Sequence, residues 1–164
     1  MHQNVTVSLQ THQRIISLAD AWHITLREAT AIVIKDCYQI MRQCWCMGIG
    51  FDQEVNWFGL VMEAARDRVD RESPAPIEQA VVPHLRSPRV KDEATQLHVW
   101  EEVTKPLGMI AASLGRNTAE TLEYLIAQYT SVSDRLIERG LFETEGQWWM
   151  NQIVNLTLID WGPH

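Results

Sequence analysis

The sequence predicts a mainly helical protein made of two similar units, each a short strand followed by two helices and one extra helix. Three observations predict this fold class. The 164-residue chain matches itself without gaps at a shift of 92 residues. Each copy opens on a short run in which polar and apolar residues alternate, which is typical of a half-buried strand. Apolar residues then recur at spacings of three and four, which is typical of an amphipathic helix.

The self-match covers residues 3–70 and 95–162, which we interpret as two degenerate copies of one unit. Gly48 aligns with Gly140 and Trp57 with Trp149, and this shared register makes chance agreement between helical stretches a poor explanation. Other identical pairs include Val7/Val99, Ala19/Ala111, Glu28/Glu120 and Ile34/Ile126. Residues 71–94 hold four of the six prolines. Since proline continues neither a helix nor a central strand, this stretch is expected to be a linker.

In the first copy, the alternation predicts a strand over residues 4–10, and the apolar spacing predicts a helix of about three turns that ends at Trp22. Thr25 and Glu28 then form a Thr-x-x-Glu capping box, in which each side chain accepts a hydrogen bond from the other residue's backbone N–H. A second helix is expected to begin there. A third is expected over residues 52–70, with Gly48 as a C-cap between them.

The second copy has the same order, with a strand expected over residues 96–100. Thr104 is expected to cap a helix that has Pro106 in its first turn, where a missing N–H costs little, and Gly115 to end it. Asn117, with a glutamate three residues on, repeats the capping box before the next helix. Gly140 is the matching C-cap, and a third helix is expected over residues 144–160.

This pattern resembles the ribbon-helix-helix (Arc/MetJ-type) family of DNA-binding proteins. In the second copy, the residues that carry the resemblance are Val99, Glu102, Thr104, Leu107, Ala111, the turn Leu114-Gly115-Arg116-Asn117-Thr118, Leu122, Leu125, Ile126 and Tyr129. In the first copy they are Val5, Val7, Leu9, Ile15, Leu18, Ala19, Ile24, Thr25 and Ala29. The resemblance implies that the two strands form one antiparallel ribbon. Either the strands of one chain pair as a pseudo-dimer, or two chains pair as a homodimer.

The resemblance also implies that the ribbon lies in the major groove of double-stranded DNA and that its outward side chains contact base edges. On the first strand, these base-reading residues are Asn4, Thr6, Ser8 and Gln10. The second-helix N-termini are expected to hold phosphate, through Thr25, Arg27, Arg116, Asn117 and Thr118. The alternative interpretation of the same residues is a solvated polar strand face and ordinary helix caps.

Charge favours the first copy as the DNA-binding one. Residues 1–50 carry four basic and three acidic residues, a net charge of +1, whereas residues 95–162 carry four basic and nine acidic residues, a net charge of −5. On the second strand, the outward residues are expected to be Gln96, His98, Trp100 and Glu102. Trp100 is bulky and phosphate repels Glu102, so this face suits a protein surface better than a groove.

Two functions follow as hypotheses. The first is a DNA-binding protein, either a transcriptional regulator or a DNA-processing accessory factor, whose ribbon reads the major groove. The second is a non-enzymatic adaptor that keeps the fold for pairing and binds a protein partner through Trp100, Trp148 and the C-terminal helix. The charge of −7 argues against binding nucleic acid or membranes through bulk positive charge.

No catalytic, cofactor or metal site is expected. Cys37, Cys44 and Cys46 do not supply a four-ligand metal set, and we interpret them as buried thiols. No arrangement of nucleophile and base, or of paired carboxylates, stands out. No apolar run is long enough to span a membrane and no signal peptide is evident, so a cytoplasmic, reduced protein is expected.

Overall fold

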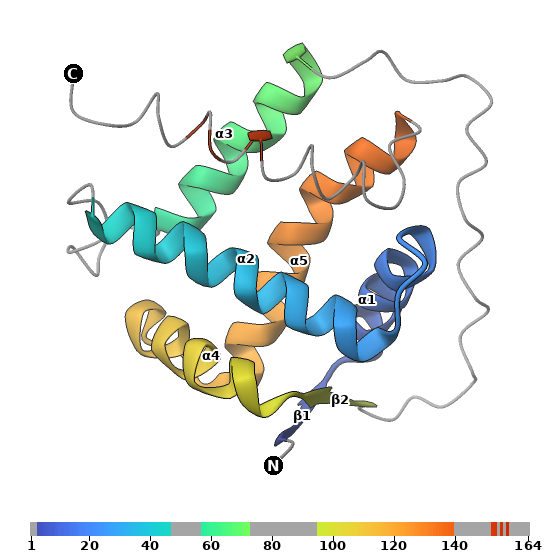
Figure 1. The fold of residues 1–164 in the computed structure, drawn as a ribbon, viewed down its shortest axis with the longest axis vertical. Helices are drawn as coiled ribbons and strands as arrows, with labels where there is room; N and C mark the ends of the chain where they lie inside the picture. The colour runs from blue at the N-terminus through green and yellow to red at the C-terminus, as the bar shows by residue number, and fades with distance from the viewer. Residues whose placement is uncertain are drawn as a thin grey trace.

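The computed structural model describes residues 3–46, 57–72 and 95–139, together with Gln152, Ile153, Asn155 and Thr157. Over these residues, the predicted class is confirmed: the protein is mainly helical, with a small two-stranded antiparallel sheet (Figure 1). The elements in chain order are β1 (Gln3–Val7), α1 (Leu9–Ala21), α2 (Leu26–Cys46), α3 (Trp57–Glu72), β2 (Thr95–Val99), α4 (Glu101–Leu114) and α5 (Thr118–Glu138).

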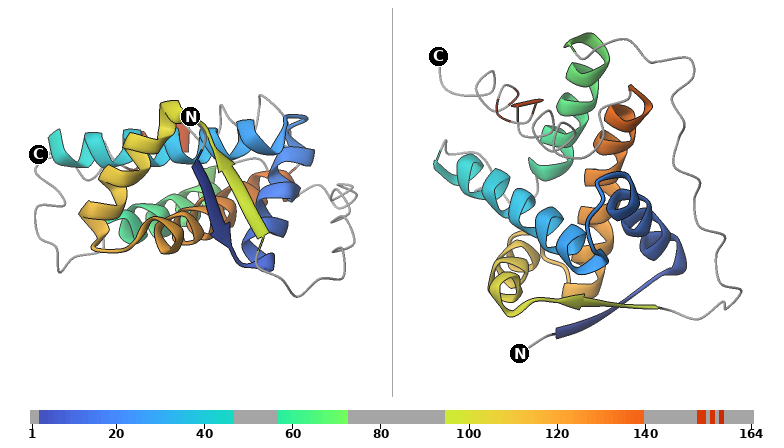
Figure 2. Two further views of the ribbon diagram at one scale, coloured as in Figure 1. Left: turned by 90° about the horizontal axis from the view of Figure 1, so that it is seen from below. Right: turned by 45° about the vertical axis from the view of Figure 1, so that its right-hand side comes forward.

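β1 and β2 come from the same chain and pair antiparallel, so the two strands form a ribbon within one molecule. Val5 lies opposite Leu97 at the centre of this ribbon, and both are buried. Val7 and Val99 are buried on the same inward face. Figure 2 shows the two strands side by side at one end of the helical body. The ribbon therefore has one apolar face on the core and one face directed away from it.

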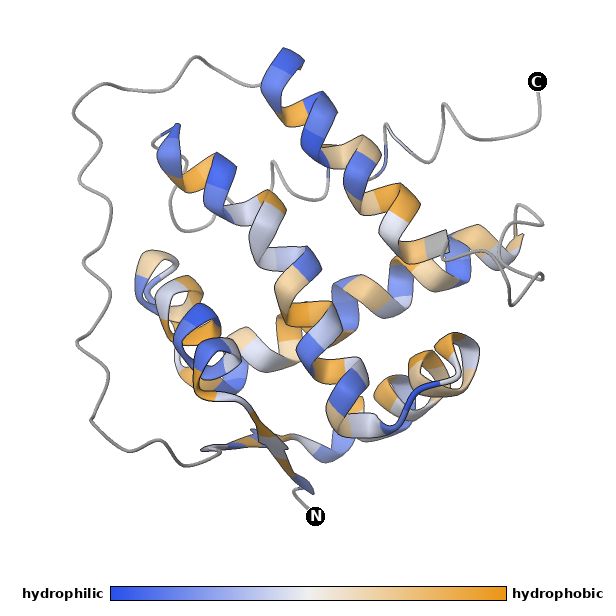
Figure 3. Cartoon of the chain, turned by 180° about the vertical axis from the view of Figure 1, so that it is seen from behind, coloured by the Kyte–Doolittle hydropathy of each residue, from blue (hydrophilic) through white to orange (hydrophobic). Residues whose placement is uncertain are grey.

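The described chain has two halves, residues 3–72 and residues 95–139, and the helices of one half pack crosswise against those of the other. α1 contacts α5, α4 contacts α2, and the long helices α2 and α5 contact each other. The same pattern holds at the ribbon, where α5 contacts β1 and α2 contacts β2. Each helix carries both hydrophobic and hydrophilic residues along its length, as expected for helices with one apolar face (Figure 3). The largest fully buried side chains include Ile15, Leu18, Ile34, Leu107, Ile110, Leu122 and Tyr129. Each half therefore buries its apolar face against the other.

The bounds of the elements follow the 92-residue shift seen in the sequence. β1 spans residues 3–7 and β2 spans 95–99, while α2 spans 26–46 and α5 spans 118–138. α1 and α4 begin at residues 9 and 101. Beyond α5, Ile153 and Thr157 are buried, as are Val61 and Ala65, the residues 92 positions earlier in α3.

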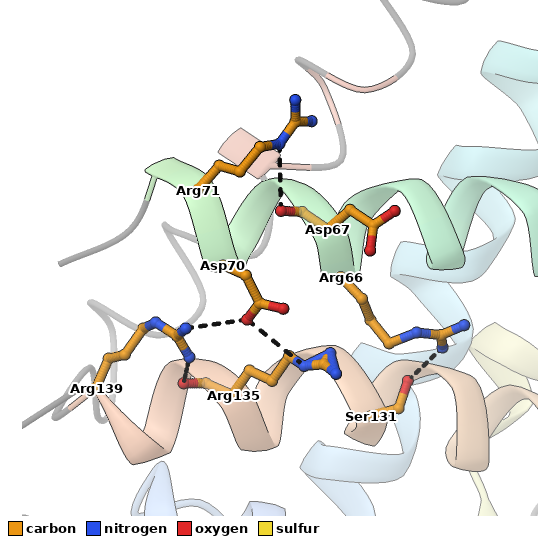
Figure 4. A network of polar contacts seen from close by, with 7 residues as sticks. All are labelled: Arg66, Asp67, Asp70, Arg71, Ser131, Arg135 and Arg139. Carbon is orange, nitrogen blue, oxygen red and sulfur yellow. Dashed lines mark hydrogen bonds and ion pairs between the residues drawn. The ribbon is translucent and has the colours of Figure 1, made fainter. Parts of the chain in front are cut away.

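α3 packs against α5 at the end of the molecule away from the ribbon (Figure 1). A polar network joins the two helices (Figure 4). Oδ1 of Asp70 lies 3.0 Å from Nη2 of Arg139 and 3.8 Å from Nε of Arg135. Arg66 donates to Oγ of Ser131 at 2.8 Å. Asp70 is thus the carboxylate shared by Arg135 of α5 and by Arg139, the C-cap of that helix.

The ends of the helices test the predicted caps. Gly115 ends α4 in the left-handed conformation (φ 66°), as predicted for a glycine C-cap. The prediction that Thr104 caps α4 is wrong, because α4 begins at Glu101 and the Thr104 hydroxyl donates to the Trp100 carbonyl. Pro106 consequently lies in the second turn, not the first. The predicted C-caps Gly48 and Gly140 lie outside the described residues.

Candidate nucleic-acid interface

The outward face of the ribbon presents four exposed polar side chains: Asn4, Thr6, Gln96 and His98. In the strand register, Asn4 lies opposite His98 and Thr6 opposite Gln96. All four have hydrogen-bonding groups, and none is a carboxylate. The predicted outward orientation of Asn4 and Thr6 on β1, and of Gln96 and His98 on β2, is confirmed. These two cross-strand pairs therefore define the exposed chemistry of the ribbon.

The prediction that Ser8 and Gln10 extend this strand is wrong. β1 ends at Val7, and the alternation of Ser8, Leu9 and Gln10 continues into a helix instead. Ser8 is the N-cap of α1, and its hydroxyl oxygen accepts from the backbone N–H of Thr11 at 3.3 Å. Serine at this position satisfies an N–H group that has no partner within the helix. Gln10 is exposed in the first turn of α1, so neither residue belongs to the outward face of the ribbon.

Glu123 of α5 provides a second cap for α1 that the sequence did not predict. Its Oε1 atom accepts from the backbone N–H of Ser8 at 2.5 Å and from the hydroxyl of Thr11 at 3.4 Å. The bond from the Ser8 backbone holds the pKa of the Glu123 carboxyl below its ordinary value. Because Ser8 and Glu123 are 115 residues apart, no local sequence pattern could have indicated the contact. This contact joins the two halves next to the ribbon.

The corresponding corner of the other half is built differently, and it corrects the prediction for the second strand. Trp100 does not face outward on the strand. It is half-buried, packs against the core, and holds the N-cap position of α4 without a side-chain hydrogen bond. Glu102 is exposed in the first turn of α4, and its carboxylate lies 3.6 Å from Nζ of Lys35. Neither residue lies on the outward face of β2. The bulk of Trp100 and the negative charge of Glu102, which were predicted to disfavour DNA binding by this face, are therefore absent from it.

The N-terminus of α2 is one of the two predicted phosphate sites. Oγ1 of Thr25 accepts from the backbone N–H of Glu28 at 3.2 Å, which confirms the predicted N-cap. Other N–H groups of a first helical turn lack a partner within the helix and attract anions. Arg27 is exposed in this turn and adds a positive charge. Glu28 is the acidic residue of the same turn and opposes an anion there.

The N-terminus of α5 is the other predicted phosphate site. Oδ1 of Asn117 accepts from the backbone N–H of Glu120 at 2.8 Å, and the Asn117 amide donates back to the Glu120 carboxylate. Thr118 is the first residue of α5. The guanidinium of Arg116 lies over the ring of Tyr124, 4.3 Å from its centroid. This cation–π contact places the positive charge beside the N-terminus of α5 while Arg116 stays exposed.

A partly buried polar contact joins the two long helices. The Tyr129 hydroxyl of α5 donates to Oδ2 of Asp36 in α2 at 2.6 Å. Burial raises the pKa of Asp36 to about 6, although the bond from Tyr129 works in the other direction. Tyr129 also makes an edge-to-face contact with Trp22, with ring centroids 6.2 Å apart. Tyr129 and Trp22 are both buried, so these contacts help to join α2 and α5 inside the molecule.

The remaining predictions concern the cysteines, metal binding, membrane spans and Trp148. Cys37 and Cys44 are buried as predicted, whereas Cys46 is exposed, because α2 carries it onto its outer side. Among the described residues, no three histidines, cysteines or acidic residues gather as metal ligands. Within the same ranges, no helix has the length and apolar character to cross a membrane. Trp148 lies outside the described residues.

Comparison of the chain with protein-family models, with curated proteins and with solved structures finds no match of any of the three kinds.

Proposed function

We propose that the protein binds double-stranded DNA and inserts the β1–β2 ribbon into the major groove. The observation that carries this proposal is the outward face of the ribbon, which holds only Asn4, Thr6, Gln96 and His98 between its two ends. A two-stranded ribbon has the width that the major groove admits. Amide side chains pair with adenine in two hydrogen bonds, and hydroxyl groups bond to several bases.

The two halves are, in this proposal, degenerate copies of one ribbon-helix-helix-like unit. The equal bounds of β1 and β2 and of α2 and α5 at a shift of 92 residues, together with the crosswise packing, support this interpretation. The helix N-termini beside β1 and β2 would then flank the groove and contact phosphate, with Arg27 on one side and Arg116 on the other. With two flanking sites and few basic residues, electrostatic attraction to phosphate would contribute little to the free energy of DNA binding. A small contribution of this kind is consistent with a net charge of −7.

The adaptor alternative assigned Trp100 to a binding surface. Trp100 packs against the core of its own molecule. Nothing in the described part of the chain favours that alternative over DNA binding, and it stays a prediction for the segment that includes Trp148.

Fluorescence anisotropy with a random-sequence duplex, titrated from low to physiological salt, tests the proposal. We expect binding at low salt and a plot of log K against log salt with a slope of roughly −2 to −4, as two to four phosphate contacts would give. Absence of binding at the lowest salt would overturn the proposal.

Two variants and one control locate the interface. Arg27→Ala and Arg116→Ala should each weaken binding to all sequences and reduce the steepness of the salt dependence by about 1. Arg71→Ala removes the same charge from an exposed position on α3, at the far end of the molecule, and should leave both quantities nearly unchanged. Equal effects of Arg27→Ala and Arg71→Ala would count against contacts at the ribbon end.

A further inference from the structure

The strand register contains a two-fold relation between β1 and β2. The central pair of the ribbon is Val5 opposite Leu97, and an axis through this pair exchanges the two antiparallel strands. This axis relates every residue of β1 to the residue 92 positions later in β2. On the outward face, it exchanges Asn4 with Gln96 and places Thr6 on the position of His98. The structural axis thus coincides with the sequence shift.

The four outward side chains obey this symmetry at one position and break it at the other. Asn4 and Gln96 both end in a carboxamide, so the axis exchanges like chemistry. Thr6 carries a hydroxyl, whereas His98 carries an imidazole, so the axis exchanges unlike chemistry. A symmetric reader makes symmetric contacts and selects a palindromic site. This ribbon is symmetric in its amides alone.

The cross-strand pairs decide which groups act together. Asn4 lies opposite His98, so one end of the outward face combines an amide with the imidazole. Thr6 lies opposite Gln96, so the other end combines an amide with the hydroxyl. Paired side chains of this kind have Cβ atoms roughly 5 Å apart and reach adjacent base pairs. Each half of a bound duplex would therefore meet one amide and one different neighbour.

The flanks of the ribbon break the symmetry in the same way. Arg27, in the first turn of α2, corresponds through the axis to Ala119, and Arg116 corresponds to Ile24. Each flank thus has one arginine, but the two arginines hold different positions relative to their caps. Arg116 is in addition stacked on Tyr124, with which Phe58 of α3 makes an edge-to-face contact.

Resting on the proposed function, we propose that the ribbon recognises a non-palindromic duplex site. Its two halves share an adenine that contacts Asn4 in one half and Gln96 in the other. They differ at the neighbouring base pair, which His98 contacts in one half and Thr6 in the other. The ring N–H and ring nitrogen of His98 offer a donor and an acceptor, whereas the Thr6 hydroxyl and methyl group also suit thymine.

Selection of bound duplexes from a random-sequence pool by the full chain, followed by sequencing, tests this inference. The expected consensus has equivalent adenines in both halves and different bases beside them. A strictly palindromic consensus would overturn the inference and leave the proposed function standing. Failure to retain any duplex would instead overturn the proposed function, and this inference with it.

A symmetrised variant makes the test sharper. The double change Asn4→Gln and His98→Thr gives both strands the same outward side chains, and both positions are exposed, so the fold and the thermal stability should be unchanged. This variant should select a palindrome. The ratio of its affinity for the wild-type consensus to its affinity for the palindromic form of that consensus should be at least tenfold lower than the same ratio for the wild-type chain. Gln10→Ala is the control, because Gln10 is exposed on α1 off the ribbon face, and it should keep the wild-type consensus. Retention of the asymmetric consensus by the double variant would overturn the inference.

Discussion

Asp36 and Tyr129 form the partly buried polar contact between α2 and α5, and the strength of this contact depends on pH. The pKa of Asp36 is raised to about 6 by burial, above the ordinary value of 3.8 for an aspartate. The folded chain therefore holds this proton more tightly than the unfolded chain, and the free energy of unfolding should rise as pH falls from above 6 towards 4. A shift of this size corresponds to at most about 3 kcal/mol.

Comparison of the wild-type chain with Asp36→Asn isolates this contribution. Urea unfolding at pH 7 and pH 5 should show a smaller gain on acidification in the variant. Asp134, whose pKa is also raised to about 6, by desolvation and by neighbouring Glu138, contributes equally to both chains. Tyr129→Phe should cost about 1–2 kcal/mol at pH 7, because it removes a partly buried hydrogen bond. If Asp36→Asn gained as much stability on acidification as the wild-type chain, the assignment of this pH dependence to Asp36 would be wrong.

Glu123 should make the free energy of unfolding change with pH in the opposite direction to Asp36. Its pKa is lowered, first by the backbone bond from Ser8, so its contribution to stability is present above the ordinary carboxyl range and is lost as pH falls through the lowered pKa. Glu123→Ala should lower the free energy of unfolding at pH 7 by about 1 kcal/mol, the usual effect of losing a helix cap. At pH 3 the two chains should unfold more nearly alike. A difference that grows on acidification would contradict the assigned contact.

At the scale of elements, the Asp70 carboxylate links α3 to two arginines at the C-terminal end of α5, in addition to the bond from Arg66 to Ser131. Asp70 is 49% exposed, whereas the side chain of Arg139 is 9% exposed, so loss of Asp70 leaves a nearly buried cation without this partner. Asp70→Asn should destabilise α3 by about 1 kcal/mol, seen as roughly fivefold faster amide hydrogen exchange in residues 57–72.

The neighbouring Asp67→Asn is the matched control for this helix. It makes the same change of charge at an exposed position whose carboxylate contacts neither Arg135 nor Arg139. Exchange in α3 should stay close to that of the wild-type chain. Equal acceleration in both variants would show that helix charge, and not the shared ion pair, holds α3 in place.

The elements could be predicted from sequence where the signal is local. Period-two alternation and apolar spacing located both strands and the four helices α1, α2, α4 and α5, and Gly115 and Asn117 marked their caps correctly. The end of β1 was missed because the alternation of Ser8, Leu9 and Gln10 fits a strand and a first helical turn equally well. The start of α4 was missed because Pro106 suggested a later N-terminus, although Glu101 and Glu102 are typical of a first turn.

The candidate site was predicted only in part, for a related reason. The outward direction of Asn4 and Thr6 follows from the strand period alone. The contacts of Ser8 with Glu123 and of Arg116 with Tyr124 depend on how the helices pack, and the first of these joins residues 115 positions apart. Trp100 lies off the ribbon face because α4 begins at Glu101, and the sequence did not predict this start.

At the scale of the whole molecule, crosswise packing predicts that neither half folds alone. α1 buries its apolar face on α5, and α4 buries its face on α2. Fragments 1–94 and 95–164 should each give weak, non-cooperative circular dichroism melts at low concentration. An equimolar mixture should regain helical signal and a cooperative transition. A cooperative, monomeric fragment 1–94 would contradict this prediction.

The pairing of β1 with β2 inside one chain also fixes how the ribbon responds to dilution. A ribbon assembled from two molecules vanishes below the dissociation constant of the dimer, so its abundance falls with the square of dosage when chains are scarce. Here the partner strand arrives at a fixed effective concentration set by the connecting segment. The fraction of chains with an intact ribbon is then independent of copy number. A cell with a few molecules has the same proportion assembled as a cell with thousands, and a related chain exchanges into the pair only when its concentration approaches that effective concentration.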